Sequence, residues 1–173
     1  MNGTELKNAL RRLEIKYQQQ QQQQNKNLLR NCGVHPANML PKCGQILNQG
    51  SFMIVNTDPV QSEGTHWLAL YCPIENGGDV IEVFDSYGFK LETYPIVKQF
   101  LVDRCHPLLV KTIEGVPVQD EKSDTCGPHC IFYLAKRILE NRSMHEVVTE
   151  CYGGCQLLND CLVLHYLFDH IML

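Results

Sequence analysis

The stretch SDTCGPHC, residues 123–130, combines two cysteines and a histidine directly before the apolar run IFYLAKRIL. Cysteines in such a setting serve as a redox pair, as half of a zinc site, or as a nucleophile at the start of a helix. A thioredoxin-type redox pair has two residues between its cysteines. Three residues separate Cys126 from Cys130, so the spacing disfavours redox chemistry.

A zinc site would need further ligands elsewhere in the chain. The one other cluster is CYGGC, with Cys151 and Cys155, followed by Cys161 and His165. It lacks the second compact ligand pair of a structural zinc site. We therefore interpret these cysteines as small core residues of the terminal helices, and we predict no metal.

The third chemistry is that of a nucleophile, and Cys126 stands where a helix over 126–141 is expected to begin. The free N–H groups and the dipole at a helix start stabilise a thiolate. Pro128 is tolerated in a first turn, and Gly127 leaves the backbone open to a substrate. An N-cap is available from Ser123, Asp124 or Thr125.

A nucleophilic thiol also needs a base, a group that orients the base, and donors to an oxyanion. His66 opens a predicted strand in GTHWLALY, and Asp85 closes the next strand in EVFDSYG. Hairpin pairing would set the two side by side, with one imidazole nitrogen on the carboxylate and the other facing the thiol. Gln119, seven residues before Cys126, could donate its side-chain amide to the oxyanion together with the Cys126 N–H. Each residue alone has a plainer structural explanation, and their combination indicates a catalytic site.

The elements that must position these residues follow from hydrophobic patterning. Strands are expected over 50–59, 65–72, 80–88 and 108–119. Helices are expected over 93–104, 126–141, 143–150 and 156–172. Strands in the middle and helices at the end predict an α+β fold, with a small mixed sheet flanked by helices.

The N-terminal region has a separate pattern. A helix is predicted from Thr4 as N-cap, with helical spacing of Leu6, Leu10, Leu13 and Tyr17. The glutamine run 18–24 is typical of a polar linker. We assign residues 1–30 to a helix and linker and 31–173 to the catalytic domain, and we expect the helix to dock on that domain.

Composition narrows the class of protein. The 173 residues suit one domain, and a formal charge of −4 argues against a surface that coats nucleic acid. Nine cysteines, an odd number, without an export signal predict reduced thiols. The apolar stretches are shorter than the roughly 18 residues of a membrane span. We expect an intracellular monomer that is neither secreted nor membrane-bound.

The order His, Asp, Gln, Cys, together with HW, FDSYG and Gln-x6-Cys-Gly, resembles the adenovirus protease superfamily, which includes the SUMO-deconjugating proteases. Within it, GVHPANMLP, IVNTDP, GTHWLALY and VFDSYG look most similar to proteases of Polinton/Maverick transposons and related virus-like elements. The resemblance covers about residues 32–150. It implies the cysteine-protease fold of that superfamily, with the nucleophile at a helix start.

The resemblance also implies roles for individual residues. They are Cys126 as nucleophile, His66 as base, Asp85 as orienting carboxylate, Gln119 with the Cys126 N–H as oxyanion donors, and Trp67 and Gly127 along a narrow substrate groove. The implied reaction is peptide-bond hydrolysis through a thioester acyl-enzyme. The implied substrates are capsid precursors, cleaved during maturation in the host cytoplasm or nucleus or inside virus particles.

Two features depart from the adenovirus enzyme, which is activated by a disulfide-linked peptide and by DNA. The spacing of Cys105 to Gln119 does not match the peptide-binding cysteine, and the acidic balance argues against DNA. The chemistry itself requires no cofactor.

Three other hypotheses concern the activity and the base. The chain could be a SUMO- or ubiquitin-like deconjugating protease, or an inactive binding module or structural zinc protein. His129, three residues from Cys126, could be proposed as the base in place of His66. A neighbour on the same helix cannot easily face the thiol and a carboxylate at once, so we expect His129 at the surface or along the groove.

Overall fold

The computed structural model describes residues 1–21, 29–40, 49–59, 66–74, 80–104 and 109–172. The α-helices are α1 (Gly3–Gln21), α2 (Pro95–Arg104), α3 (Cys126–Ile138), α4 (Met144–Glu150) and α5 (Gln156–Leu167). The strands are β1 (Arg30–Pro36), β2 (Ser51–Asn56), β3 (Trp67–Tyr71), β4 (Val80–Phe84) and β5 (Leu109–Lys111). The short helical segments are η1 (Ala37–Met39), η3 (Leu91–Thr93) and the π-helical η4 (Phe168–Met172).

The five strands form one mixed sheet in the order β1-β2-β3-β4-β5. The two outer pairs, β1 with β2 and β4 with β5, are parallel. The inner pairs, β2 with β3 and β3 with β4, are antiparallel. The predicted α+β class, with a small mixed sheet flanked by helices, is confirmed.

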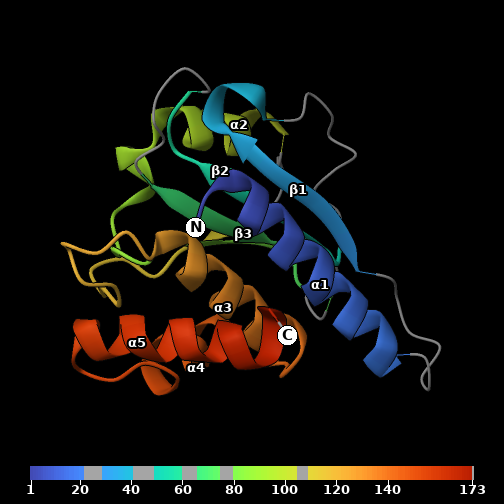
Figure 1. The fold of residues 1–173 in the computed structure, drawn as a ribbon. Helices are drawn as coiled ribbons and strands as arrows, with labels where there is room; N and C mark the ends of the chain where they lie inside the picture. Colours follow the sequence, from blue (N-terminus) through green and yellow to red (C-terminus); the bar gives the residue numbers. More distant parts are fainter. Residues whose placement is uncertain (22–28, 41–48, 60–65, 75–79, 105–108, 173) are drawn as a thin grey trace.

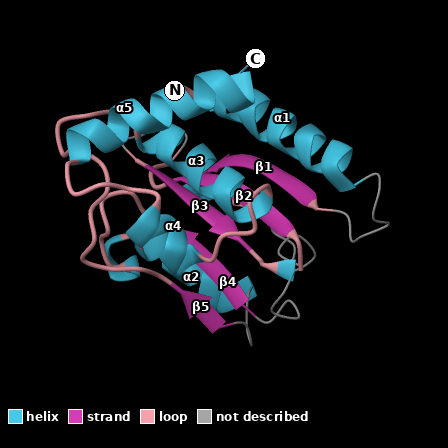
Figure 2. Ribbon diagram, turned by 90° about the horizontal axis from the view of Figure 1, so that it is seen from below, coloured by secondary structure: helices cyan, strands magenta, loops and turns pink. Residues whose placement is uncertain are grey.

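Both faces of the sheet are covered by helices (Figures 1 and 2). Phe52 and Ile54 of β2 point into the cluster formed with α1, α3, α4 and α5. Met53 and Val55 point to the opposite face, into the cluster that includes Val97 of α2. Burial on both faces explains why β2, β3 and β4 are nearly continuous apolar runs instead of alternating ones.

The helix α1 packs into the main core, as expected. Leu6, Leu10 and Leu13 are fully buried in the same cluster as the apolar side chains of α3. Figure 1 shows α1 running beside β1 across the edge of the sheet. The helix continues to Gln21, inside the predicted linker, because glutamine is a good helix former and propagates a helix already begun.

The start of α1 is capped by a different residue from the one predicted. The Asn2 side-chain oxygen accepts from the backbone N–H groups of Thr4 and Glu5, each at 3.0 Å. The Glu5 carboxylate accepts in return from the Asn2 N–H at 2.7 Å. Asn2 and Glu5 thus form a reciprocal cap, and Thr4 lies inside the helix.

The strand predicted over 108–119 is much shorter than expected, because β5 ends at Lys111. Beyond it, the segment bonds to the turn that follows β4. The N–H groups of Val118 and Gln119 donate to the Ser86 carbonyl at 2.8 and 3.1 Å. These bonds to a turn replace the ladder that a longer strand would need.

The C-terminal helices cover α3 from outside (Figure 2). A capping box at Ser143 and Glu146 starts α4. The helix predicted over 156–172 is α-helical as far as Leu167 and continues as η4. Across the described parts of the chain, no helix combines the length and apolar character that crossing a membrane requires.

Candidate active site

His66 and Asp85 meet at one end of the sheet. His66 directly precedes β3 and Asp85 directly follows β4, and these strands are antiparallel neighbours. His66 Nε2 lies 2.7 Å from Asp85 Oδ1. The two residues are only 6 % and 8 % exposed. The predicted pairing across the hairpin is therefore present.

The Asp85 carboxylate is saturated with donors. Oδ1 accepts from the Tyr87 N–H at 2.8 Å in addition to His66. Oδ2 accepts from the Phe89 N–H at 3.1 Å and from the Tyr94 hydroxyl at 2.7 Å. Burial acts to raise the pKa of Asp85, but the hydrogen bond and charge of His66, with those of Tyr94 and Tyr87, lower it overall. Asp85 is thus a fixed anion behind the imidazole.

His66 is favoured in its protonated form. Burial acts to lower its pKa, and hydrogen bonds and charge from Asp85 and Cys126 outweigh burial and raise the pKa to about 9. Among the described residues, no nitrogen or oxygen bonds to His66 Nδ1. The ring centroid of Tyr87 lies 4.7 Å from that of the imidazole. Asp85 thus holds the ring through Nε2, and Cys126 lies near enough to raise the pKa of the imidazole.

Cys126 is the first residue of α3, as predicted, and is 6 % exposed. Thr125 occupies the N-cap position, but its side chain makes no capping bond. The Thr125 hydroxyl donates instead to Asp160 Oδ1 at 2.9 Å. The prediction of a side-chain cap at this helix is therefore wrong, because the hydroxyl is engaged with α5.

Gln119 is buried at 1 % exposure beside the turn after β4. Its Oε1 accepts from the Ser86 hydroxyl at 2.6 Å. Its Nε2 donates to the carbonyl and hydroxyl of Ser123, at 2.9 and 3.1 Å, and to the Tyr87 hydroxyl at 3.2 Å. Burial and then the nearby Cys126 raise the pKa of Tyr87, the residue that touches both His66 and Gln119.

Trp67 and Gly127, predicted to line the substrate groove, lie in different surroundings. Trp67 is half-buried, and its carbonyl accepts from Cys130 Sγ at 3.3 Å. Gly127 is buried, and a Cβ on it would lie 3.1 Å from Leu6 Cδ2 and 3.5 Å from Met1 Cβ. The face of Gly127 that was expected to be open is covered by Leu6 of α1 and by Met1, so an added Cβ would press against the Leu6 side chain.

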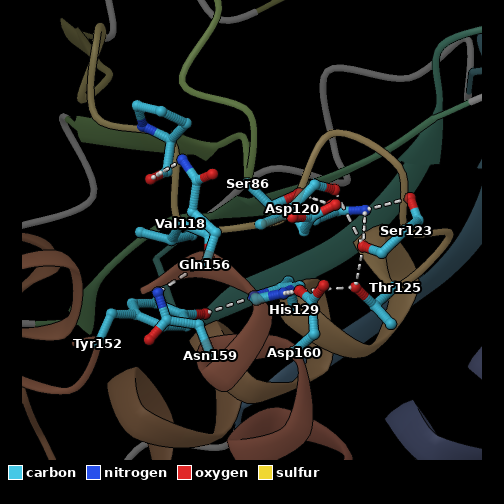
Figure 3. A network of polar contacts seen from close by, with 12 residues as sticks. Ser86, Val118, Asp120, Ser123, Thr125, His129, Tyr152, Gln156, Asn159 and Asp160 are labelled. Atoms are coloured by element: carbon cyan, nitrogen blue, oxygen red, sulfur yellow. Dashed lines mark hydrogen bonds and ion pairs between the residues drawn. The ribbon is translucent and has the colours of Figure 1, made fainter. Parts of the chain in front are cut away.

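His129 is neither at the surface nor along a groove, so that expectation is wrong. It is fully buried, with Nε2 2.8 Å from Asp160 Oδ1 and Nδ1 3.1 Å from the Tyr152 hydroxyl (Figure 3). The same-helix neighbour therefore does meet a carboxylate, but one on α5, whereas His66 meets Asp85. The two histidines belong to separate pairs.

The C-terminal cysteines also differ from expectation. Cys155 and Cys161 are exposed and Cys151 is partly exposed, so they are not core residues. The helix α5 presents Cys161 to solvent because Val163 and Leu167 face the core. Within the described ranges, no group of three or more His, Cys, Asp or Glu side chains is arranged to hold a metal ion. Cys105 lies outside the described residues.

Three residues of the site were not singled out from the sequence. Tyr87 and Ser86 belong to the FDSYG motif, so the motif itself was the available signal. Tyr94, whose hydroxyl bonds to Asp85, sits between η3 and α2 outside any quoted motif. Tyr94 reaches the Asp85 carboxylate only because the chain folds back toward it after β4.

Comparison with curated proteins finds distant relatives among viral cysteine proteases. The chain is 31% identical over 102 residues to a SUMO-1 cysteine protease of African swine fever virus, a match covering 56% of this chain and 37% of that protein. A cysteine protease from another isolate of the virus matches equally well. No family model matches the chain. The chain is thus distantly homologous to cysteine proteases, over little more than a third of their length.

Solved structures give matches of lower similarity. A crystal structure of the African swine fever virus protease has a TM-score of 0.42 and 24% identity, covering 65% of this chain and 42% of that one. ChlaDub1 from Chlamydia trachomatis has a TM-score of 0.44 and 16% identity, covering 68% and 57%. The central domain of a Legionella pneumophila protein has a TM-score of 0.49 and 13% identity, covering 82% and 85%. The inferred relation to cysteine proteases therefore rests on the sequence match to the viral proteins.

Proposed function

We propose that the protein is a cysteine endopeptidase that hydrolyses peptide bonds through a thioester acyl-enzyme. The observation that carries this proposal is the buried His66–Asp85 pair near Cys126, the first residue of α3. A thiol, an imidazole and an orienting carboxylate are the groups that covalent peptide hydrolysis needs. The distant homology to viral cysteine proteases supports the same reaction.

Because His66 favours its protonated form, the Cys126 proton rests on His66 Nδ1 in the first half of the reaction, and the sulfur attacks the substrate carbonyl carbon. The carbonyl π electrons move to oxygen, and the oxyanion accepts from the Cys126 N–H and from Gln119 Nε2. Of the Gln119 contacts, the bond to the Tyr87 hydroxyl is the longest at 3.2 Å, and its hydrogen is the one we expect to turn to the oxyanion. His66 then protonates the leaving amine as the C–N bond breaks, which leaves a thioester on Cys126.

In the second half, water attacks the thioester carbonyl while His66 Nδ1 removes a proton from the water. The same donors hold the second oxyanion. Collapse of this intermediate breaks the C–S bond, releases the carboxylic acid and leaves the Cys126 sulfur beside the protonated His66, as at the start. Asp85 keeps Nε2 protonated throughout, so that Nδ1 is the nitrogen exchanging protons.

The first candidate substrates are capsid precursor proteins, processed during particle maturation. The resemblance to virus-like element proteases and the viral origin of the relatives support this class. We propose an intracellular monomer that needs no cofactor for its chemistry. An activating peptide and DNA are tested by adding each to the assay at low salt, where an electrostatic effect of DNA is largest.

The second candidate is removal of SUMO or a ubiquitin-like protein from conjugates. One relative is a SUMO-1 cysteine protease, which favours testing this class. Both substrate classes require the same thiol chemistry, and they differ in what the surface beyond Cys126 recognises. Activity on one class and not the other identifies the biological role.

The test incubates the full chain with capsid-precursor peptides and, separately, with SUMO and ubiquitin conjugates. We expect one class to be cleaved, and Cys126→Ala to abolish cleavage while circular dichroism shows an unchanged fold. The matched control is Cys161→Ala, an exposed cysteine on α5 whose loss should leave turnover unchanged. Wild-type protein that cleaves neither class and is not alkylated at Cys126 would support an inactive binding module.

A further inference from the structure

A second histidine–carboxylate pair lies beneath the candidate active site and takes no part in the mechanism above. His129 and Asp160 are 0 % and 6 % exposed in their side chains, and Nε2 lies 2.8 Å from Oδ1. Burial lowers the pKa of His129 and outweighs the effect of Asp160, so the imidazole is neutral. A carboxylate only accepts, so Nε2 of the neutral ring carries the hydrogen, and Nδ1 accepts from the Tyr152 hydroxyl. The Nε2–H of His129 is therefore directed at Asp160.

Figure 3 shows the Asp160 carboxylate linked to Thr125 and Thr125 linked to Ser123, and Gln119 contacts Ser123 in turn. A carboxylate only accepts, so the single hydrogen of the Thr125 hydroxyl goes to Asp160 at 2.9 Å. The single hydrogen of the Ser123 hydroxyl is shared between the Thr125 hydroxyl at 2.8 Å and the Asp120 carbonyl at 3.1 Å. Gln119 Nε2 donates to the Ser123 oxygen at 3.1 Å. Three polar contacts thus join Asp160 to the Gln119 amide.

The neighbouring residue Asn159 holds the other side of Gln119. Its Nδ2 donates to the Val118 carbonyl at 3.0 Å and to the Gly153 carbonyl at 3.1 Å. Its Oδ1 accepts from the Gly153 N–H at 2.8 Å. Two consecutive residues of α5 therefore contact the segment before Gln119 and the segment after it.

We propose that Asp160, braced by His129, is a positioning residue that aims the Gln119 side-chain amide at the oxyanion through Thr125 and Ser123. The proposal rests on the endopeptidase function. The bonds of Nε2 to Ser123 fix the plane of the amide, and this leaves its other hydrogen on the side of Tyr87 and His66. A donor fixed before the reaction stabilises the oxyanion without reorganising.

Two features of this arrangement lower the stability of the fold, which argues for a role of Asp160 beyond packing. Asp160 Oδ2 is buried without a hydrogen-bond partner among the described residues. Thr125 gives up the stabilising capping bond that an N-cap threonine usually makes. An apolar residue at 160 would avoid the first cost and free Thr125 from the second.

The kinetic test compares Asp160→Ala, the conservative Asp160→Asn and the control Val163→Ala on the same helix. Val163 is fully buried and apolar, so its loss weakens the α5 core without touching the hydrogen bonds. We expect Asp160→Ala to lower kcat about tenfold at unchanged KM, because the oxyanion exists only in the transition state. Asp160→Asn, which keeps Oδ1 as acceptor, should recover part of kcat. Val163→Ala should lower stability and leave kcat within about twofold.

A double-mutant cycle distinguishes action through Gln119 from an independent effect. Gln119→Ala should lower kcat about 100-fold, and adding Asp160→Ala should cause no further loss. Iodoacetamide should alkylate Cys126 at the same rate in wild type and Asp160→Ala, because the thiol and His66 are untouched. If the two losses of kcat multiply in the double mutant, the proposal is overturned. Slower alkylation of Cys126 in Asp160→Ala would overturn it as well.

A structural measurement decides the positioning role even if the protein cleaves none of the substrates offered. In ¹⁵N-labelled protein, the side-chain amide signals of Gln119 should shift in Asp160→Ala and stay in place in Val163→Ala. Unshifted Gln119 signals in Asp160→Ala would refute the inference whatever the activity. Absence of cleavage by wild type, with shifted Gln119 signals, would instead count against the endopeptidase proposal alone.

Discussion

His66 Nε2 lies 2.7 Å from Asp85 Oδ1, and this contact determines which imidazole nitrogen faces Cys126. The carboxylate also accepts from Tyr87, Phe89 and Tyr94, so it cannot follow the imidazole if the ring turns. Nδ1 is thereby left for the sulfur. The fixed carboxylate thus holds the imidazole in one orientation, in which only Nδ1 exchanges protons.

Replacing Asp85 tests whether this carboxylate orients His66. Asp85→Asn keeps the shape but removes the charge, so we expect roughly 10²- to 10⁴-fold lower kcat with measurable residual activity. The pKa of His66, about 9 in the native protein, should fall because Asp85 contributes to raising it. The alkaline limb of kcat/KM against pH should move to lower pH. The control Asp103→Asn, on an exposed part of α2, should leave the limb in place.

Stability should depend on pH through His66. Its folded pKa of about 9 lies above the unfolded value of about 6.5, so the folded state binds this proton more tightly. The resulting stabilisation is complete below about pH 6.5 and is lost as pH rises toward 9. Urea unfolding at several pH values should show the free energy of unfolding falling across this window. A His66→Gln variant with the same decline would contradict the assignment.

Gly88 should tolerate no side chain, because two constraints act on it at once. Its φ is +67°, and a Cβ would lie 2.8 Å from the Val116 backbone nitrogen. We expect Gly88→Ala to lower the free energy of unfolding by about 3 kcal/mol or more.

Two other glycines separate these constraints. Gly115 has φ +73° with nothing within 4 Å of its Cβ position, so Gly115→Ala should cost only about 1 kcal/mol of backbone strain. Gly154→Ala, with neither constraint, should change stability by less than about 0.5 kcal/mol. Equal losses at Gly88 and Gly115 in urea titrations would show that the approach to Val116 carries no cost.

Leu6 should contribute strongly to stability although it lies far from the sheet in sequence. It is fully buried, and Leu6→Ala should lower the free energy of unfolding by about 2–5 kcal/mol. Ile15, on the same helix and 43% exposed, provides the control, and Ile15→Ala should cost much less. Equally small losses of stability for Leu6→Ala and Ile15→Ala, in thermal or urea unfolding, would mean that α1 detaches without affecting the rest of the molecule.

The sequence predicted the elements whose patterning is strong. The runs around β2, β3 and β4 and the helix from Cys126 were found because both the sheet faces and α3 are deeply buried. β1 was not predicted, because of its seven residues only Val34 is buried and its pairing with β2 is irregular between Asn31 and Val34. β1 is a strand because it pairs with β2, and its own hydrophobic pattern does not predict it.

The site residues show the same division between local and distant causes. His66 and Asp85 could be paired from the sequence because a hairpin places the ends of its strands together. Asp160 could not be connected to Gln119, because that link passes through two hydroxyls from a loop with no periodic pattern. His129 was misplaced because helical spacing gives its distance from Cys126 and not which neighbouring helix supplies a carboxylate.

The position of the first residues of α1 has a practical consequence for handling the protein. Met1 lies against Gly127, and a Cβ on Gly3 would be 3.7 Å from the Trp67 ring. An affinity tag joined before Met1 would therefore emerge beside Gly127, the residue after Cys126, and would crowd the candidate site. A tag that is cleaved off completely keeps this side of Cys126 clear.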